Sequence, residues 1–167
     1  MTRGRSPGPR PPRIKAFDAG VRLLSRRPYA SAELSRRLLS LGYPEDEVRP
    51  ALGVFAELGY IDDATFAEMH VRRRSGRRGP RALAAELAAR GVDRDTAQHA
   101  IGALDRDSQV RAAVRLVHRS VGGKRPASYD ELLDTAGAKL LRRGFSHAIA
   151  WAACREVWTG ASSTPEA

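Results

Sequence analysis

The chain has 167 residues, of which 42% are hydrophobic and 6% aromatic, and its 29 Lys and Arg against 19 Asp and Glu give a net charge of +10. This composition favours helices over a large sheet, because Ala, Leu, Arg and Glu are good helix formers and aromatic and β-branched residues are sparse. The single cysteine, Cys154, excludes an internal disulfide and a cysteine-based zinc site and indicates a reducing cytoplasm, and no apolar run is long enough to cross a membrane.

The beginning of the chain carries positive charge and few hydrophobic residues. Residues 1–15 are mainly Gly, Pro, Ser and Arg. Such a composition cannot build a core, so we predict a disordered basic arm. Apolar residues then recur at helical spacing, and Phe17, Val21 and Leu24 share the apolar face of a first predicted helix, which Pro28 ends.

The next three predicted helices have recognisable start and stop signals. Ser31 is a candidate cap for the second helix, and Gly42 ends it. The third helix contains Pro50, so we expect it to start late or to bend. Asp62 or Asp63 caps the fourth helix.

Similar signals divide the rest of the chain into five more helices, which makes about nine in an all-α fold. A proline suits a first helical turn, and Ser or Asp suits the position before it. The later helix starts are predicted at Pro80, Asp93, Ser128 with Glu131 as a capping box, and Ser146. A further helix is predicted around Val114, between the helix that starts at Asp93 and the one that starts at Ser128. Residues 160–167 form a short predicted disordered tail.

Three glycines anchor an internal repeat. Gly42, Gly91 and Gly144 each follow a leucine by four residues and precede an apolar residue. A helix that stops at a left-handed glycine, an apolar residue that packs back and a second helix would give this pattern, although Leu- and Ala-rich helices can also resemble one another by chance. A preceding helix completes each unit, so we predict three tandem three-helix repeats. The predicted repeats span residues 16–61, 62–104 and 105–159.

Residue types that catalyse reactions are not grouped in this sequence. The four histidines lack the spacing of metal ligands, and the adjacent Asp62 and Asp63 suit a helix cap better than catalysis. We find no Gly-rich phosphate loop and no nucleophile motif. We therefore predict a binding protein that is not an enzyme and uses no cofactor or metal, with Tyr60, Phe66 and Cys154 in its core.

Arginine is the residue type that stands out. Six arginines fall within ten positions where one predicted helix ends and the next begins, and two further pairs precede repeat glycines. Arginines near a helix end also interact with the helix dipole, but three in a row fan around the helix. We predict an anion-binding surface, a solvated basic surface being the alternative. Its candidate residues are Arg72, Arg73, Arg74, Arg77, Arg78 and Arg81, supported by Arg36, Arg37, Arg142 and Arg143.

Four segments resemble the RecX family, the bacterial regulatory proteins of the recombinase RecA. The most specific is ELGYIDDATFAEMHVRRR at residues 57–74. The others are AGVRLLSRRPYASAELSRRLLSLGY at residues 19–43, GPRALAAELAARGVD at residues 79–93 and KLLRRGFSHAIAWAAC at residues 139–154. The resemblance covers about residues 16–158. The sequence departs from the family pattern at Pro50, Ala97, Ala150 and Cys154, which affects the packing expected in these places.

The resemblance implies a fold, a partner and an activity. It implies tandem three-helix repeats in an elongated, curved array that binds in the groove of the RecA–DNA filament, which is RecA protein on single-stranded DNA. It further implies inhibition of RecA strand exchange, ATPase and co-protease activity, and thereby regulation of DNA repair and the SOS response. We also expect a cytoplasmic monomer with weak direct DNA binding and no membrane association. The alternative is a stand-alone DNA-binding module or transcription regulator.

Overall fold

The computed structural model describes residues 15–122 and 126–162, and over these residues it forms helices and no strand. The predicted all-α fold is therefore confirmed. The predictions of a disordered arm and tail lie almost wholly outside the described residues. The predicted start of the tail at residue 160 is wrong, because the last helix continues to Ser162.

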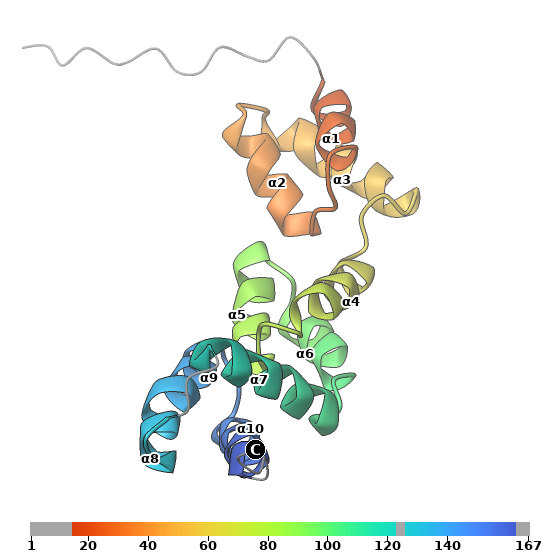
Figure 1. Cartoon of the computed structure of the whole chain (residues 1–167). Helices are drawn as coiled ribbons and strands as arrows, with labels where there is room; N and C mark the ends of the chain where they lie inside the picture. The colour runs from red at the N-terminus through yellow and green to blue at the C-terminus, as the bar shows by residue number, and fades with distance from the viewer. Residues whose placement is uncertain (1–14, 123–125, 163–167) are drawn as a thin grey trace, which may run out of the picture. The chain divides into compact units, whose positions relative to one another are not determined.

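The helices follow one another with short connections (Figure 1). Their bounds are α1 (Ala16–Leu24), α2 (Ser31–Ser40), α3 (Glu45–Glu57), α4 (Asp63–Arg74), α5 (Pro80–Arg90), α6 (Arg94–Gly102), α7 (Arg106–Val121), α8 (Tyr129–Leu132), η1 (Leu133–Gly137), α9 (Ala138–Arg142) and α10 (His147–Ser162). Because α8, η1 and α9 are continuous, the described residues contain nine helical stretches, as predicted.

The chain divides into two compact units. The first unit contains the residues up to Phe66 together with Arg90–Val92, and the second contains Ala67–Ala89 together with the chain from Asp93 onward. Each unit has a hydrophobic core of its own.

The core of the first unit lies between α1, α2 and α3. Helix α1 buries Ala16, Ala19 and Gly20 and leaves Phe17 and Val21 exposed. Leu24 packs against the core, so the predicted apolar face of this helix is confirmed at Leu24 alone. The reason is a close helix contact: a Cβ atom on Gly20 would lie only 2.4 Å from the ring of Phe55. Small residues therefore form the contact, and the Phe17 ring stacks on the Phe55 ring at 4.9 Å between centroids.

Two predicted helix starts are wrong for physical reasons. Ala30, not Ser31, is the N-cap of α2, and the backbone N–H of Ser31 donates to Asp63 Oδ1 at 2.7 Å. Helix α3 begins at Glu45 and runs through Pro50, so the late start is not observed, and the alternative of a bend at Pro50 stays a prediction. Its acidic first turn favours an early start, because carboxylates are stabilised at the positive end of a helix dipole.

Other predicted caps are confirmed. Asp62 caps α4 by accepting the backbone N–H of Thr65 at 3.1 Å, and this bond contributes most to holding the pKa of Asp62 below its usual value. Asp93 caps α6, and Ser128 caps α8 while the Glu131 carboxylate accepts the N–H of Ala127. These bonds satisfy N–H groups that a helix start leaves unpaired.

The repeat glycines adopt the predicted left-handed geometry. The φ angles are 91° at Gly42, 85° at Gly91 and 86° at Gly144, a region that residues with a Cβ atom rarely enter. The apolar residue after each glycine is buried; these residues are Tyr43, Val92 and Phe145. The predicted helix–glycine–helix junctions are therefore confirmed.

The core of the second unit is built around α7 and α10. Val117, Leu140 and Phe145 are buried there, and Cys154 is fully buried, as predicted. Burial raises the pKa of the Cys154 thiol. The π-helical turn η1 has no counterpart in the sequence prediction. It buries Ala136 and Gly137, and Gly137 packs against Cys154.

Tyr60 and Phe66 differ in their burial. Phe66 is buried, as predicted. Tyr60 is 60% exposed, so its predicted core position is wrong. Its ring is tilted by 58° relative to the Phe55 ring, with 6.4 Å between the two centroids.

Candidate anion-binding site

The six predicted arginines of the central cluster lie on three consecutive segments of the second unit. Arg72, Arg73 and Arg74 form the last turn of α4, Arg77 and Arg78 lie in the connection, and Arg81 is in the first turn of α5. Arg72, Arg73, Arg77 and Arg81 are exposed, whereas Arg74 and Arg78 are half-buried. The structure therefore divides the cluster into two groups.

The half-buried group is paired with one carboxylate. Glu86 on α5 accepts from Arg74 Nη2 at 3.1 Å and from Arg78 Nε at 3.0 Å through Oε1, and its Oε2 lies 2.9 Å from His70 Nε2. Burial opposes ionisation of Glu86, but the hydrogen bonds from Arg74 and His70 outweigh it and lower the pKa of the Glu86 carboxyl. Arg74 and Arg78 thus join α4 and the following connection to α5.

This pairing has an expected pH dependence. Because the pKa of Glu86 is lowered in the folded state, its contribution to stability is complete above the ordinary glutamate pKa of 4.5 and is lost as pH falls through the folded-state pKa. Glu86→Gln is expected to lower the free energy of unfolding at neutral pH by about 1 kcal/mol or less, since the arginines are partly exposed. The difference from the wild type should shrink below about pH 4.5. Urea unfolding at several pH values measures this.

Glu68→Gln is the matched control for that measurement. Glu68 is exposed on the same helix, α4, and forms no ion pair within the described part of the chain. Its replacement should leave the pH dependence of the free energy of unfolding unchanged. If Glu86→Gln and the wild type have the same free energy of unfolding at every pH, the Glu86 cluster has no stabilising role.

The connection between α4 and α5 packs directly on the last repeat glycine. The N–H of Gly79 donates to the carbonyl of Arg143 at 2.9 Å, and the N–H of Arg81 donates to the carbonyl of Gly144 at 3.2 Å. A Cβ atom on Gly79 would lie 2.3 Å from the backbone nitrogen of Phe145. Glycine at this position therefore allows two backbones to touch, and the contact brings Arg77 and Arg143 to the same cavity.

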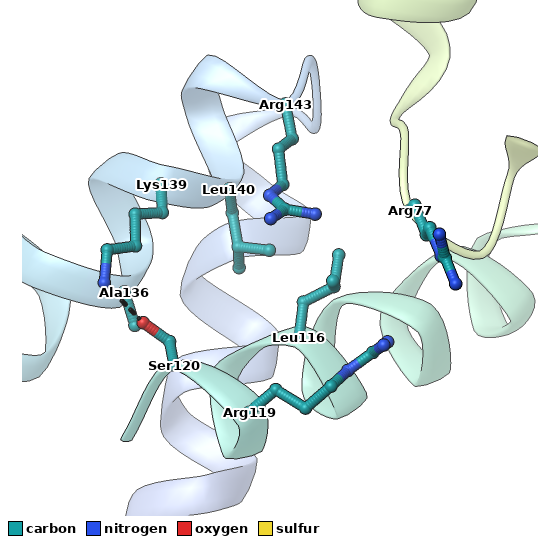
Figure 2. A pocket seen from close by; sticks show the side chains of 8 residues that line it. All are labelled: Arg77, Leu116, Arg119, Ser120, Ala136, Lys139, Leu140 and Arg143. Carbon is teal, nitrogen blue, oxygen red and sulfur yellow. Dashed lines mark hydrogen bonds between the residues drawn. The ribbon is translucent and has the colours of Figure 1, made fainter. Parts of the chain in front are cut away.

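This cavity has a volume of about 540 Å³ and lies wholly within the second unit. Figure 2 shows Arg119 and Arg143 on either side of Leu116, with Lys139 beside Ser120 toward one end and Arg77 toward the other. The lining residues are Arg77, Leu116, Arg119, Ser120, Ala136, Lys139, Leu140 and Arg143. Four of them carry positive charge, three are apolar and none is acidic.

Two of the lining cations are held by hydrogen bonds. Lys139 Nζ donates to Ser120 Oγ at 2.8 Å, and Arg119 Nε donates to the carbonyl of Arg115 at 3.3 Å. Sequence reasoning missed Arg119 and Lys139. A weak signal existed for Arg119, because it shares a helix face with Leu116, three residues before it.

The two supporting arginine pairs lie in different places. Arg36 and Arg37 are exposed on α2 in the first unit, six and five residues before Gly42. Arg142 and Arg143 immediately precede Gly144 in the second unit, so the two pairs are not equivalent in the repeat. Arg143 lines the cavity, and Arg142 is exposed without lining it.

The described residues lack two other kinds of feature. No group of three or more His, Cys, Asp or Glu side chains among them is arranged to hold a metal ion. No helix in residues 15–122 and 126–162 is both long and apolar enough to span a bilayer.

The fold and this cavity together define the class of protein: a helical-repeat protein that presents clustered cations. Known proteins identify the family. Proteins named Regulatory protein RecX are 37% identical over 138 residues in Thermobifida fusca, where 81% of this chain and 75% of the relative are covered, and 37% identical over 138 residues in Mycobacterium tuberculosis, where 78% of each is covered. The chain belongs to the RecX family of regulatory proteins.

Family models and solved structures agree with this assignment. The model for the first three-helix domain of RecX matches residues 16–53, and the model for the second matches residues 62–101. The crystal structure of RecX from Lactobacillus salivarius is similar with a TM-score of 0.76 and 25% identity, covering 85% of this chain and 94% of that one. A second structure of a regulatory protein RecX shares the fold, with a TM-score of 0.72 over 80% of this chain and 68% of that one. The predicted tandem three-helix fold is confirmed.

Proposed function

We propose that this protein binds the filament of RecA on single-stranded DNA and inhibits RecA strand exchange, ATPase and co-protease activity. It would thereby regulate DNA repair and the SOS response, acting in the cytoplasm as a monomer and not as an enzyme. Membership of a family of regulatory proteins supports a regulatory role, and the chemistry of the second unit supports an anionic partner.

The observation that carries the proposal is the separation of exposed arginines from paired ones. Arg74 and Arg78 are engaged by Glu86, whereas Arg72, Arg73 and Arg81 are exposed and no carboxylate of the described residues pairs with them. Exposed guanidinium groups suit phosphates and carboxylates, which they bind through two parallel hydrogen bonds. A filament of protein and DNA offers both groups.

The proposed mechanism is steric and electrostatic. Helical repeats would lie in the filament groove, with exposed arginines against acidic protein faces and DNA phosphates, and would block access of partner DNA. Such contacts act at long range in low salt and are screened as salt rises. Inhibition is therefore expected to weaken with increasing ionic strength.

Purified RecA provides the test. The full chain is titrated into a single-strand-dependent ATPase assay and a strand-exchange assay, each with folding confirmed by circular dichroism. We expect inhibition at protein concentrations comparable to RecA. No effect on either activity from folded protein at stoichiometric concentration would overturn the proposal, and tight sequence-specific binding to duplex DNA without RecA would favour a stand-alone DNA-binding module.

A further inference from the structure

The cavity of the second unit is lined by positively charged side chains that form no ion pairs with carboxylates of the described residues. Arg77, Arg119, Lys139 and Arg143 line it, and no carboxylate in the described part of the chain forms an ion pair with any of them. Arginines elsewhere in the structure do have such partners: Arg27 Nη2 lies 2.8 Å from Glu33 Oε1. Like charges around one concave surface raise the local positive potential, which favours an anionic ligand.

The position of these cations is fixed by the fold. The contact of Gly79 with the Arg143 carbonyl places Arg77 near Arg143, and Ser120 and the Arg115 carbonyl hold Lys139 and Arg119. Side chains held in this way lose less conformational freedom on binding a ligand than free ones do. The four cations are exposed to solvent, as Arg72 and Arg73 are, but they face one concave surface, which suits an anionic ligand.

The rest of the lining indicates which anion would fit. The apolar part of the wall is formed by Leu116, Ala136 and Leu140. The lining has no aromatic ring to stack on a base, and no Asn, Gln or acidic side chain to form specific hydrogen bonds with a base. Recognition of bases in single strands depends on such stacking and hydrogen bonding. Guanidinium groups instead match phosphate oxygens. The lining therefore favours binding of phosphate groups, with no recognition of the nucleic-acid bases.

Several phosphates are required to match four cations. A nucleic-acid strand holds successive phosphates close together through covalent bonds, with one for about every 3.4 Å of rise in a helical strand. Carboxylates on a folded protein surface are carried by separate side chains and have no such regular covalent spacing. We propose that this cavity binds consecutive phosphates of one DNA strand without reading its sequence. The proposal rests on the proposed function, in which the protein lies on a filament that contains such a strand.

Binding of a fluorescently labelled oligo-dT to the full chain, followed by anisotropy across a salt series, tests the proposal. The cavity variant carries Arg119→Gln and Arg143→Gln. The control variant carries Arg94→Gln and Arg106→Gln, which remove the same charge from exposed positions of the same unit outside the cavity. We expect the cavity variant to bind about tenfold more weakly or worse. Its log–log salt slope should be smaller in magnitude by about 1.4, while the control keeps the wild-type slope.

Four outcomes would overturn the cavity proposal. They are absence of oligo-dT binding by the wild type, unchanged oligo-dT binding by the cavity variant, equal weakening by the cavity and control variants, and competition by poly-L-glutamate as strong as that by unlabelled oligo-dT at equal charge. The RecA assays separate this proposal from the proposed function. The cavity variant could lose RecA inhibition but bind free oligo-dT as the wild type does. That result would overturn the cavity proposal alone, because it would mean that the cavity contacts RecA protein and not DNA. The wild-type chain could also bind oligo-dT with the expected difference in salt slope and yet have no effect on RecA. That result would overturn the proposed function alone.

Discussion

Gly144→Ala is expected to lower the free energy of unfolding of the second unit by about 2–5 kcal/mol. Two effects act at this position. The φ angle of 86° is strained for any residue with a Cβ atom, and that atom would lie 2.3 Å from the backbone nitrogen of Ala82. The neighbour is backbone and cannot rotate away, and moving it would strain the hydrogen bond from the N–H of Arg81 to the Gly144 carbonyl.

Tryptophan fluorescence during urea unfolding measures this effect selectively. The only two tryptophans of the chain, Trp151 and Trp158, both lie on α10 in the second unit. Their emission therefore reports the unfolding of this unit. The expected result is a transition at clearly lower urea concentration for the variant, because the midpoint scales with the free energy of unfolding.

Two other glycines of the same unit separate backbone strain from close contact. Gly122 has a φ angle of 59° and no atom within 4 Å of the position that a Cβ would take, so Gly122→Ala should cost only the strain of about 1–2 kcal/mol. Gly102 has neither feature, so Gly102→Ala should be neutral or stabilising by up to about 1 kcal/mol. If Gly144→Ala costs no more than Gly122→Ala, the backbone contact contributes nothing to stability.

The features that sequence reasoning predicted correctly depend on neighbouring residues. A left-handed glycine at a helix end is set by the preceding helix and the following apolar residue, and all three repeat glycines conform. The caps at Asp93 and Ser128 likewise involve bonds over three residues. Local geometry of this kind can be read directly from spacing.

The features that sequence reasoning missed depend on residues far apart in the chain. The backbone N–H of Ser31 is satisfied by Asp63, 32 residues later, so no local cap was needed. Phe17 is displaced from the core because Gly20 allows α1 to approach Phe55 closely. Neither contact has a local sequence signal, since both depend on how helices pack.

The candidate site shows the same division. The density of arginines between α4 and α5 was visible in the sequence, but the carboxylate that pairs with Arg74 and Arg78 was not, because Glu86 follows Arg74 by 12 residues. The cavity was also not predicted. The packing of α7 and α9 brings Arg119 and Lys139 together, and the contact of Gly79 with the Arg143 carbonyl adds Arg77.

If the proposed function holds, loss of positive charge at Arg72 and Arg73 is expected to have the largest effect on the inhibition of RecA. The variant Arg72→Gln with Arg73→Gln should require about tenfold more protein for half-inhibition of the RecA ATPase, because each arginine would lose a charge-assisted contact. The difference between variant and wild type in the concentration needed for half-inhibition should become smaller as salt is raised, since exposed charges are screened. The double variant Arg94→Gln with Arg106→Gln, which removes equal charge elsewhere on the unit, should inhibit as the wild type does.

A third variant decides whether all six arginines of the cluster act as contacts or only the exposed ones. Arg74→Gln with Arg78→Gln removes the two partners of Glu86 and should lower the urea midpoint of the second unit. Under conditions where it is folded, it should inhibit RecA nearly as well as the wild type, because the exposed Arg72 and Arg73 remain. If it instead loses inhibition as fully as the Arg72 and Arg73 variant, the Glu86 cluster opens on the filament, and the division of the arginines into internal and contacting groups is wrong.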